Sequence, residues 1–165
     1  MSTIKDVKLA ELGSEEVAWA ARQMLVLEEI RNDFSKNKPL EGLNIGACMH
    51  VTKETANLML TLKEGGANVA LCASNPLSTK DSVAAYLAEN DIEVHAVWGV
   101  SNEEFFKHLN SVLDTNPDIT MDDGADLVSL LHTERTDIPI MGSMEETTTG
   151  VIRLKSMEKN NKLRF

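Results

Sequence analysis

The sequence is poor in aromatic and basic residues, and this excludes two classes of partner. Aromatic residues make up 4% of the 165 residues, so the stacking platforms that bind single-stranded nucleic acid are not expected. Lysine and arginine number 16 against 26 aspartates and glutamates, which gives a formal net charge of −10. Nucleic acids and anionic membranes attract basic surfaces, so neither is an expected partner.

The sequence also lacks membrane-spanning, dinucleotide-binding and metal-binding patterns. No apolar run approaches the roughly 20 residues that cross a bilayer, and residues 1–9 form no apolar signal core. There is no Gly-rich dinucleotide loop, no P-loop and no Cys/His metal spacing. Its two cysteines, Cys48 and Cys72, fall in apolar runs and are predicted to be free, buried thiols. These features predict a soluble cytoplasmic protein without a bound metal.

Apolar runs of strand length alternate with amphipathic segments of helix length. This alternation predicts a doubly wound α/β domain with a five-stranded, mainly parallel sheet between helices. An apolar stripe from Ser14 to Asn37 predicts a long N-terminal helix, so residues 1–41 are expected to form a helical arm and residues 42–165 the βα core. Strands are expected at 43–49, 69–73, 92–98, 119–121 and 138–141, and helices at 52–64, 78–90, 102–113, 125–132 and 147–160.

Polar residues gather directly after four of the five expected strands. Parallel strands place their carboxyl ends at one edge of the sheet, where ligands bind in this class of fold. His50 can exchange protons near neutral pH, although a lone histidine can equally be a structural hydrogen-bonding group. Thr52 is predicted to bind ligand or simply to cap the next helix, and Glu54 to lie in the first turn of that helix.

Three carboxylates follow the fourth strand, at Asp122, Asp123 and Asp126. They could form a site for a hard cation, a phosphoacceptor pair as in receiver domains, or a turn that leads into the next helix. Receiver domains carry their acid pair after the first strand, which makes that alternative distant. We expect Asp126 to belong to the helix and Asp123 to bind ligand.

The last polar cluster is Glu145 to Gly150, which contains three consecutive threonines. β-branched residues are poor in the interior of a helix but suit its start, where hydroxyls and free N–H groups can hold a ligand. Thr147, Thr148 and Thr149 are therefore predicted to begin a helix at the ligand edge.

Four motifs together resemble the S-adenosyl-L-homocysteine hydrolase family. Gly46–Ala56 is similar to its His-x-Thr-x-Glu-Thr-Ala segment, and Ser74–Thr79 to its Asn-x-x-Ser-Thr stretch. Met121–Leu127, with the His-Thr pair after it, is similar to its Asp-Asp-Gly-x-Asp-Leu segment, and Glu145–Val151 reproduces its Glu-Glu-Thr-Thr-Thr-Gly-Val. The motifs keep the family's order and spacing along the whole chain.

The resemblance implies an enzyme that reversibly hydrolyses S-adenosyl-L-homocysteine to adenosine and L-homocysteine by NAD-dependent 3′ oxidation, elimination and water addition. It assigns proton transfer at the 5′ position to His50 and a place beside the ribose to Asp123. Thr52 and Glu54 would hold adenosine, and Glu146 the ribose hydroxyls. Thr147, Thr148 and Thr149 would reach the NAD. A homo-oligomer and a role in the methyl cycle of one-carbon metabolism are also implied.

The sequence departs from the family pattern in two places, and both affect the function that we expect for residues 1–165. Lys80 stands where the family usually has glutamine. The family also continues into a Rossmann domain that the sequence does not contain, so we expect residues 1–165 to be a truncated substrate-binding portion, inactive alone. The alternative is a non-catalytic module that binds adenosine or pairs with full-length subunits.

Overall fold

The computed structural model describes all 165 residues as a parallel sheet enclosed by helices. A short 3₁₀ helix, η1 (Val7–Leu9), precedes seven α-helices. The strands are β1 (Asn44–Cys48), β2 (Asn68–Cys72), β3 (Glu93–His95), β4 (Ile119–Asp122) and β5 (Gly142–Glu145). The helices are α1 (Ala10–Ala21), α2 (Leu25–Asn37), α3 (Lys53–Glu64), α4 (Asp81–Glu89), α5 (Asn102–Leu113), α6 (Asp126–Thr133) and α7 (Thr148–Lys159).

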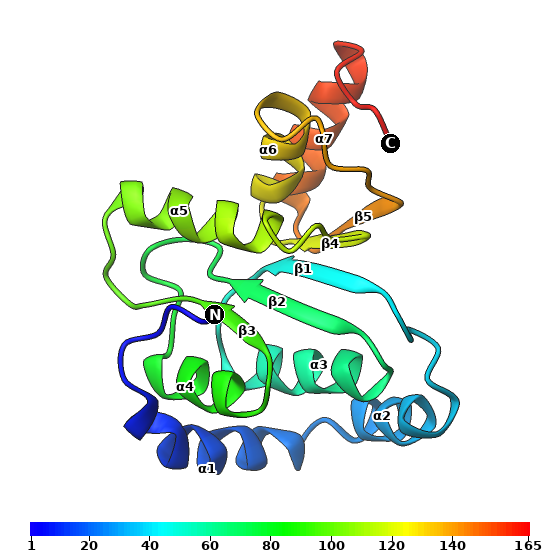
Figure 1. The fold of residues 1–165 in the computed structure, drawn as a ribbon. Coiled ribbons are helices and arrows are strands. Elements are labelled where there is room, and N and C mark those ends of the chain that lie inside the picture. Colours follow the sequence, from blue (N-terminus) through cyan, green and yellow to red (C-terminus); the bar gives the residue numbers. More distant parts are fainter.

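The strand order β3-β2-β1-β4-β5, with every pairing parallel, confirms the predicted α/β class. From β1 the chain first winds outward through β2 and β3, then returns to place β4 on the other side of β1. Helices α3 and α4 cover one face of the sheet and α5 to α7 lie on the other, as Figure 1 shows. The topology reverses between β1 and β4, and a crevice is expected there at the strands' carboxyl ends.

Two apolar clusters, one on each face of the sheet, hold the layers together. The first joins β1 and β2 to α3 and α4 and includes the fully buried Met59, Leu71 and Leu87. The second lies beneath α5 and α6 and contains Leu109 and Leu131. Cys48 and Cys72 are buried in the second cluster as free thiols, as predicted. No helix is long and apolar enough to cross a membrane.

The N-terminal segment is helical, but it divides into α1 and α2 at Arg22–Met24. Helix α1 packs against both α4 and α3, whereas α2 packs mainly against α3. Neither glycine nor proline marks the break in the sequence. The prediction of one long helix is therefore wrong, because the apolar stripe continues across two helices that lie in different directions. The packing of these helices on the domain decides where the first one ends.

The fifth strand lies at Gly142–Glu145, directly after the apolar run at 138–141 that was expected to form it. Ile138 is instead a buried part of the core beneath α5 and α6. Pairing with β4 starts when Met141 donates its N–H to the Asp118 carbonyl, and it continues to the pair Asp122 and Glu145. Ile138 and, in part, Ile140 pack into the core, Met141 is exposed, and the residues that follow make the strand.

Candidate functional site

Three loops converge at the crevice between β1 and β4. The His50 Nε2 atom lies 3.3 Å from Asp123 Oδ2, so the residue after β1 meets the residue after β4. Ser74, which follows β2, donates its hydroxyl to the same Asp123 oxygen at 3.2 Å. His50 is 54% exposed on its side chain and Asp123 20%, so the pair is accessible and yet oriented by its neighbours.

Helix α3 begins beside this pair. Thr52 is its N-cap, because its hydroxyl accepts a hydrogen bond from the Thr55 N–H, as the sequence predicted. Glu54 lies in the first turn with an exposed carboxylate that makes no hydrogen bond within the chain. His50, Thr52 and Glu54 line one hollow of about 480 Å³. Its remaining lining residues are Glu16, Val51, Lys53, Leu77, Ser78, Thr79, Lys80, Val83 and Trp98.

Lys80 faces this hollow from the start of α4. Its ammonium nitrogen lies 3.1 Å from Glu16 Oε1, and the other Glu16 oxygen accepts a hydrogen bond from the Ser82 hydroxyl at 2.6 Å. Burial acts to raise the pKa of Glu16, but the Ser82 hydroxyl and the Lys80 ammonium outweigh it and lower this pKa. Glu16 is therefore ionised at neutral pH, and it ties α1 to the wall of the hollow.

The three carboxylates at the end of β4 and directly after it have different partners. Asp122 is buried and accepts the N–H groups of Leu127 and Val128 at the start of α6. Burial raises the pKa of Asp122 to about 7 despite these two donors. Asp126 pairs with Arg153, and Asp123 pairs with His50. No group of three or more His, Cys, Asp and Glu side chains could hold a metal ion.

Glu145 organises the loop that carries the remaining predicted residues. Its Oε1 atom accepts hydrogen bonds from the Gly124 N–H, the Thr147 N–H and the Thr147 hydroxyl. Gly150 packs so closely on this carboxylate that a side chain there would overlap it. Glu146 is exposed and borders a smaller hollow of about 180 Å³ with Asp122.

Helix α7 begins within the threonine run, as predicted. Thr147 is its N-cap, and its hydroxyl accepts the Gly150 N–H at 3.0 Å while also donating to Glu145. Thr148 and Thr149 are exposed, and their hydroxyls make no hydrogen bonds within the chain. These two residues are the ones available to a ligand, and the first of the three threonines is occupied by capping.

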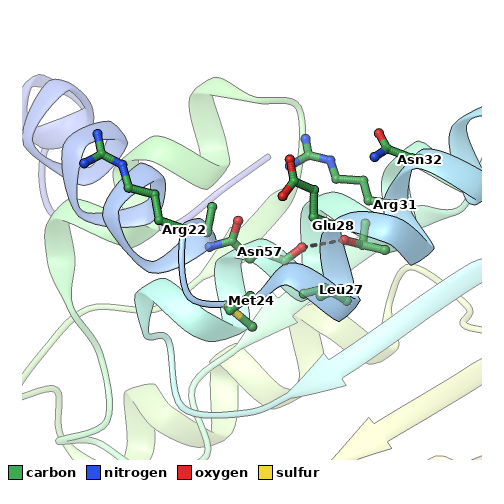
Figure 2. Close-up of a pocket in the computed structure, with 9 residues that line it drawn as sticks. Arg22, Met24, Leu27, Glu28, Arg31, Asn32 and Asn57 are labelled. Atoms are coloured by element: carbon green, nitrogen blue, oxygen red, sulfur yellow. Dashed lines mark hydrogen bonds between the residues drawn. The ribbon is translucent and has the colours of Figure 1, made fainter.

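A further hollow of about 360 Å³ lies far from the strand edge, between α1, α2 and α3 (Figure 2). Arg22, Glu28 and Arg31 surround it in Figure 2, above the buried amide of Asn57. That amide donates to the carbonyls of Val17 and Lys53 and so joins α1 to α3. None of the polar residues that follow the strands lines this hollow.

The structure adds functional neighbours that were not assigned from the sequence. Ser74 was expected at the edge, but its bond to Asp123 depends on β2 and β4 flanking β1. Glu16 lies 64 residues before Lys80. A helix start at Ser14 would place it in the first turn, but this expectation is wrong, because α1 begins at Ala10 and Glu16 lies in the middle of it. Glu145 lies in the Glu-Glu-Thr-Thr-Thr-Gly segment, but its close contact with Gly150 is seen only in the structure.

Comparison with known proteins gives the same family as the motifs of the sequence indicate. A family model described as S-adenosyl-L-homocysteine hydrolase matches residues 1–140. The chain belongs to this family. It is 54% identical to the adenosylhomocysteinase of Aquifex aeolicus, with 98% of the chain and 40% of that protein aligned.

Two further relatives differ in the nucleoside that their names contain. The S-inosyl-L-homocysteine hydrolase of Methanococcus maripaludis is 52% identical over 100% of the chain and 40% of its own length. The adenosylhomocysteinase of Pyrococcus abyssi is 50% identical over 98% of the chain and 39% of its own length. The chain thus spans about 40% of the length of the curated relatives that it matches.

Proposed function

We propose that this chain is the nucleoside-binding portion of an enzyme that reversibly hydrolyses S-adenosyl-L-homocysteine, or its counterpart S-inosyl-L-homocysteine, to the nucleoside and L-homocysteine. The observation that carries the proposal is the His50–Asp123 pair, which lies at the topological reversal of the sheet in a chain of this family. A cytoplasmic location and assembly into a homo-oligomer belong to the same proposal.

In this proposal His50 moves the proton at the 5′ position of the ribose. It protonates the departing homocysteine sulfur and later removes a proton from the incoming water. Asp123 lies 3.3 Å from the imidazole and orients it, while the Ser74 hydroxyl donates a hydrogen bond that holds the Asp123 carboxylate in place. This arrangement resembles the general pattern in which an acid orients a catalytic histidine.

The remaining polar residues at the edge would bind the nucleoside. Glu54 has an uncommitted carboxylate at the mouth of the hollow and accepts hydrogen bonds from the base. Thr52 supports it from the same helix start. Glu146, exposed on the loop before α7, binds the ribose hydroxyls. Carboxylates suit these tasks because they accept hydrogen bonds from N–H and O–H donors.

NAD, when bound, supplies the reversible oxidation of the ribose 3′ carbon. The start of α7 fits contact with such a cofactor, since Thr148 and Thr149 offer free hydroxyls beside the unpaired N–H groups of a helix N-terminus. The sequence has no Gly-rich loop for the pyrophosphate, so these residues would form only part of a cofactor site. We therefore expect no turnover from the isolated chain.

Binding to the isotopically labelled chain tests the proposal. S-adenosyl-L-homocysteine or S-inosyl-L-homocysteine should shift the amide NMR signals of residues 50–54 and 122–124, whereas L-homocysteine alone should not. Glu54→Gln should weaken binding about tenfold, the effect of one charge-assisted hydrogen bond. Glu89→Gln changes an exposed residue at the end of α4 and is the control, which should leave the binding affinity unchanged. Absence of shifts at these amides with both thioethers would refute the proposal.

A further inference from the structure

Lys80 gives the nucleoside hollow a fixed positive charge on one wall. Its backbone is held across the crevice, because the Lys80 N–H donates to the Val51 carbonyl at 3.0 Å while Val51 donates to the Ser78 carbonyl at 2.8 Å. This short parallel bridge places Lys80 opposite the loop that leads to Thr52 and Glu54. The wall is therefore part of the rigid sheet edge.

The side chain of Lys80 is 57% exposed and is directed by one ion pair. Glu16 Oε1 binds the ammonium at 3.1 Å and is itself fixed by Ser82. This ion pair uses one of the three N–H donors of the ammonium, so two remain for a ligand. Lys53 lines the same hollow, but its ammonium lies 3.8 Å from the centroid of the Trp19 ring and is directed to that face.

Two further features of this hollow suit a flat, partly polar ring. Val51 and Val83 are fully buried beneath it, and Leu77 and Trp98 are largely exposed at its rim, so apolar surface is available on more than one side. Thr79, next to Lys80, is 7% exposed, and its hydroxyl is buried without a hydrogen-bond partner. An unpaired buried hydroxyl in the lining of a hollow indicates a missing polar partner.

The polarity of the hollow distinguishes between purines. Adenine has an amino donor at C6 and an acceptor at N1, whereas a 6-oxopurine has a carbonyl acceptor at C6 and an N–H donor at N1. A lysine ammonium can only donate, and a carboxylate can only accept. A 6-oxo group facing Lys80 gains a charge-assisted hydrogen bond while its N1–H donates to Glu54. An amino group in that place would face an ammonium that cannot accept from it.

We propose that Lys80 is a specificity-determining residue that donates to the 6-oxo group of the base, so that this chain selects a hypoxanthine nucleoside over an adenine nucleoside. The inference rests on the proposed function, because it assigns the base to the hollow lined by Glu54 and Lys80. Glu16 is then a positioning residue, which holds the ammonium toward the base.

Competitive binding of inosine and adenosine to the full chain tests this inference. We expect inosine to bind about tenfold more tightly, as one charge-assisted hydrogen bond provides. Lys80→Gln, whose amide can both donate and accept, should bring the ratio of the two dissociation constants close to one. Lys80→Met keeps much of the side-chain length without any donor and should lose the preference for inosine. Lys107→Gln removes an exposed lysine charge on α5, outside the hollow, and should keep the wild-type ratio.

The outcomes separate this inference from the proposed function. Equal or tighter binding of adenosine by the wild-type chain, or a ratio that Lys80→Gln leaves unchanged, overturns the role of Lys80 while nucleoside binding stands. If neither nucleoside shifts the amide signals of residues 50–54 and 78–80, both proposals fall. The Lys80–Glu16 ion pair is partly exposed, so its loss should lower the melting temperature by only a few degrees. Circular dichroism melts of both variants within that range would show that the altered ratio is local.

Discussion

Asp122 should make the stability of this domain fall as the pH rises toward neutrality. Burial raises its pKa from 3.8 to about 7 in the folded protein, whereas the unfolded chain keeps the lower value. The folded state therefore holds a proton that the unfolded state has released. The stabilisation is fully present below about pH 4 and is lost as the pH rises through 7.

The magnitude follows from the difference between the two pKa values. A difference of about 3 corresponds to about 4 kcal/mol, since each pKa unit is worth about 1.4 kcal/mol. The carboxylate also accepts two N–H groups of α6, so Asp122→Asn carries a pH-independent cost of about 1–3 kcal/mol, because one of these donors is left poorly paired. The variant lacks the titration, so its stability relative to wild type should improve by about 3–4 kcal/mol between pH 4 and pH 8.

Urea unfolding of both proteins at several values between pH 4 and pH 8 measures this difference. Asp91→Asn is the matched control, because Asp91 is exposed and has a φ of 56°, which asparagine tolerates. Its difference from wild type should stay nearly constant across the range. A constant difference for Asp122→Asn as well, or a wild-type chain that gains stability from Asp122 as the pH rises, would refute the argument.

Two further substitutions test how the site is held together. Gly150→Ala should destabilise the domain by about 1–3 kcal/mol, because the new side chain would overlap the Glu145 carboxylate. Gly142→Ala, where a Cβ would meet open space, is its control, and similar thermal melts for the two variants would contradict the close packing. Thr52→Ala should cost about 1 kcal/mol in urea unfolding through loss of the α3 cap, and an unchanged midpoint would show that the cap contributes little.

Local signals in the sequence were enough to predict where several helices begin and how the strands are arranged. The helix at Asn102–Leu113 starts where Ser101 and Glu104 form a capping box, and both its bounds agree with the prediction. Thr52 and Thr147 cap α3 and α7 for the same reason, since a hydroxyl before a helical run satisfies a free N–H group. The parallel arrangement followed from the alternation of strands and helices, which leaves room only for crossover connections.

Other elements depended on contacts between distant residues. The break between α1 and α2 and the position of β5 after Ile138 reflect packing against α3, α4 and the core beneath α6. The sequence could not indicate that Glu16 holds Lys80, because their pairing depends on α1 crossing α4. The same is true of the Asp122 pKa, which is set by burial beneath α6.

The sequence by itself determined the class of fold, the capped helix starts and the family, because these depend on the periodicity, on neighbouring residues and on short motifs. Only the tertiary structure decided which side chains meet at the sheet edge. The strand order brings His50 and Ser74 to Asp123. Packing of α1 on α4 places Lys80, paired with Glu16, in the hollow at the sheet edge. Such pairings join residues far apart in the chain, and sequence patterns act over only a few residues.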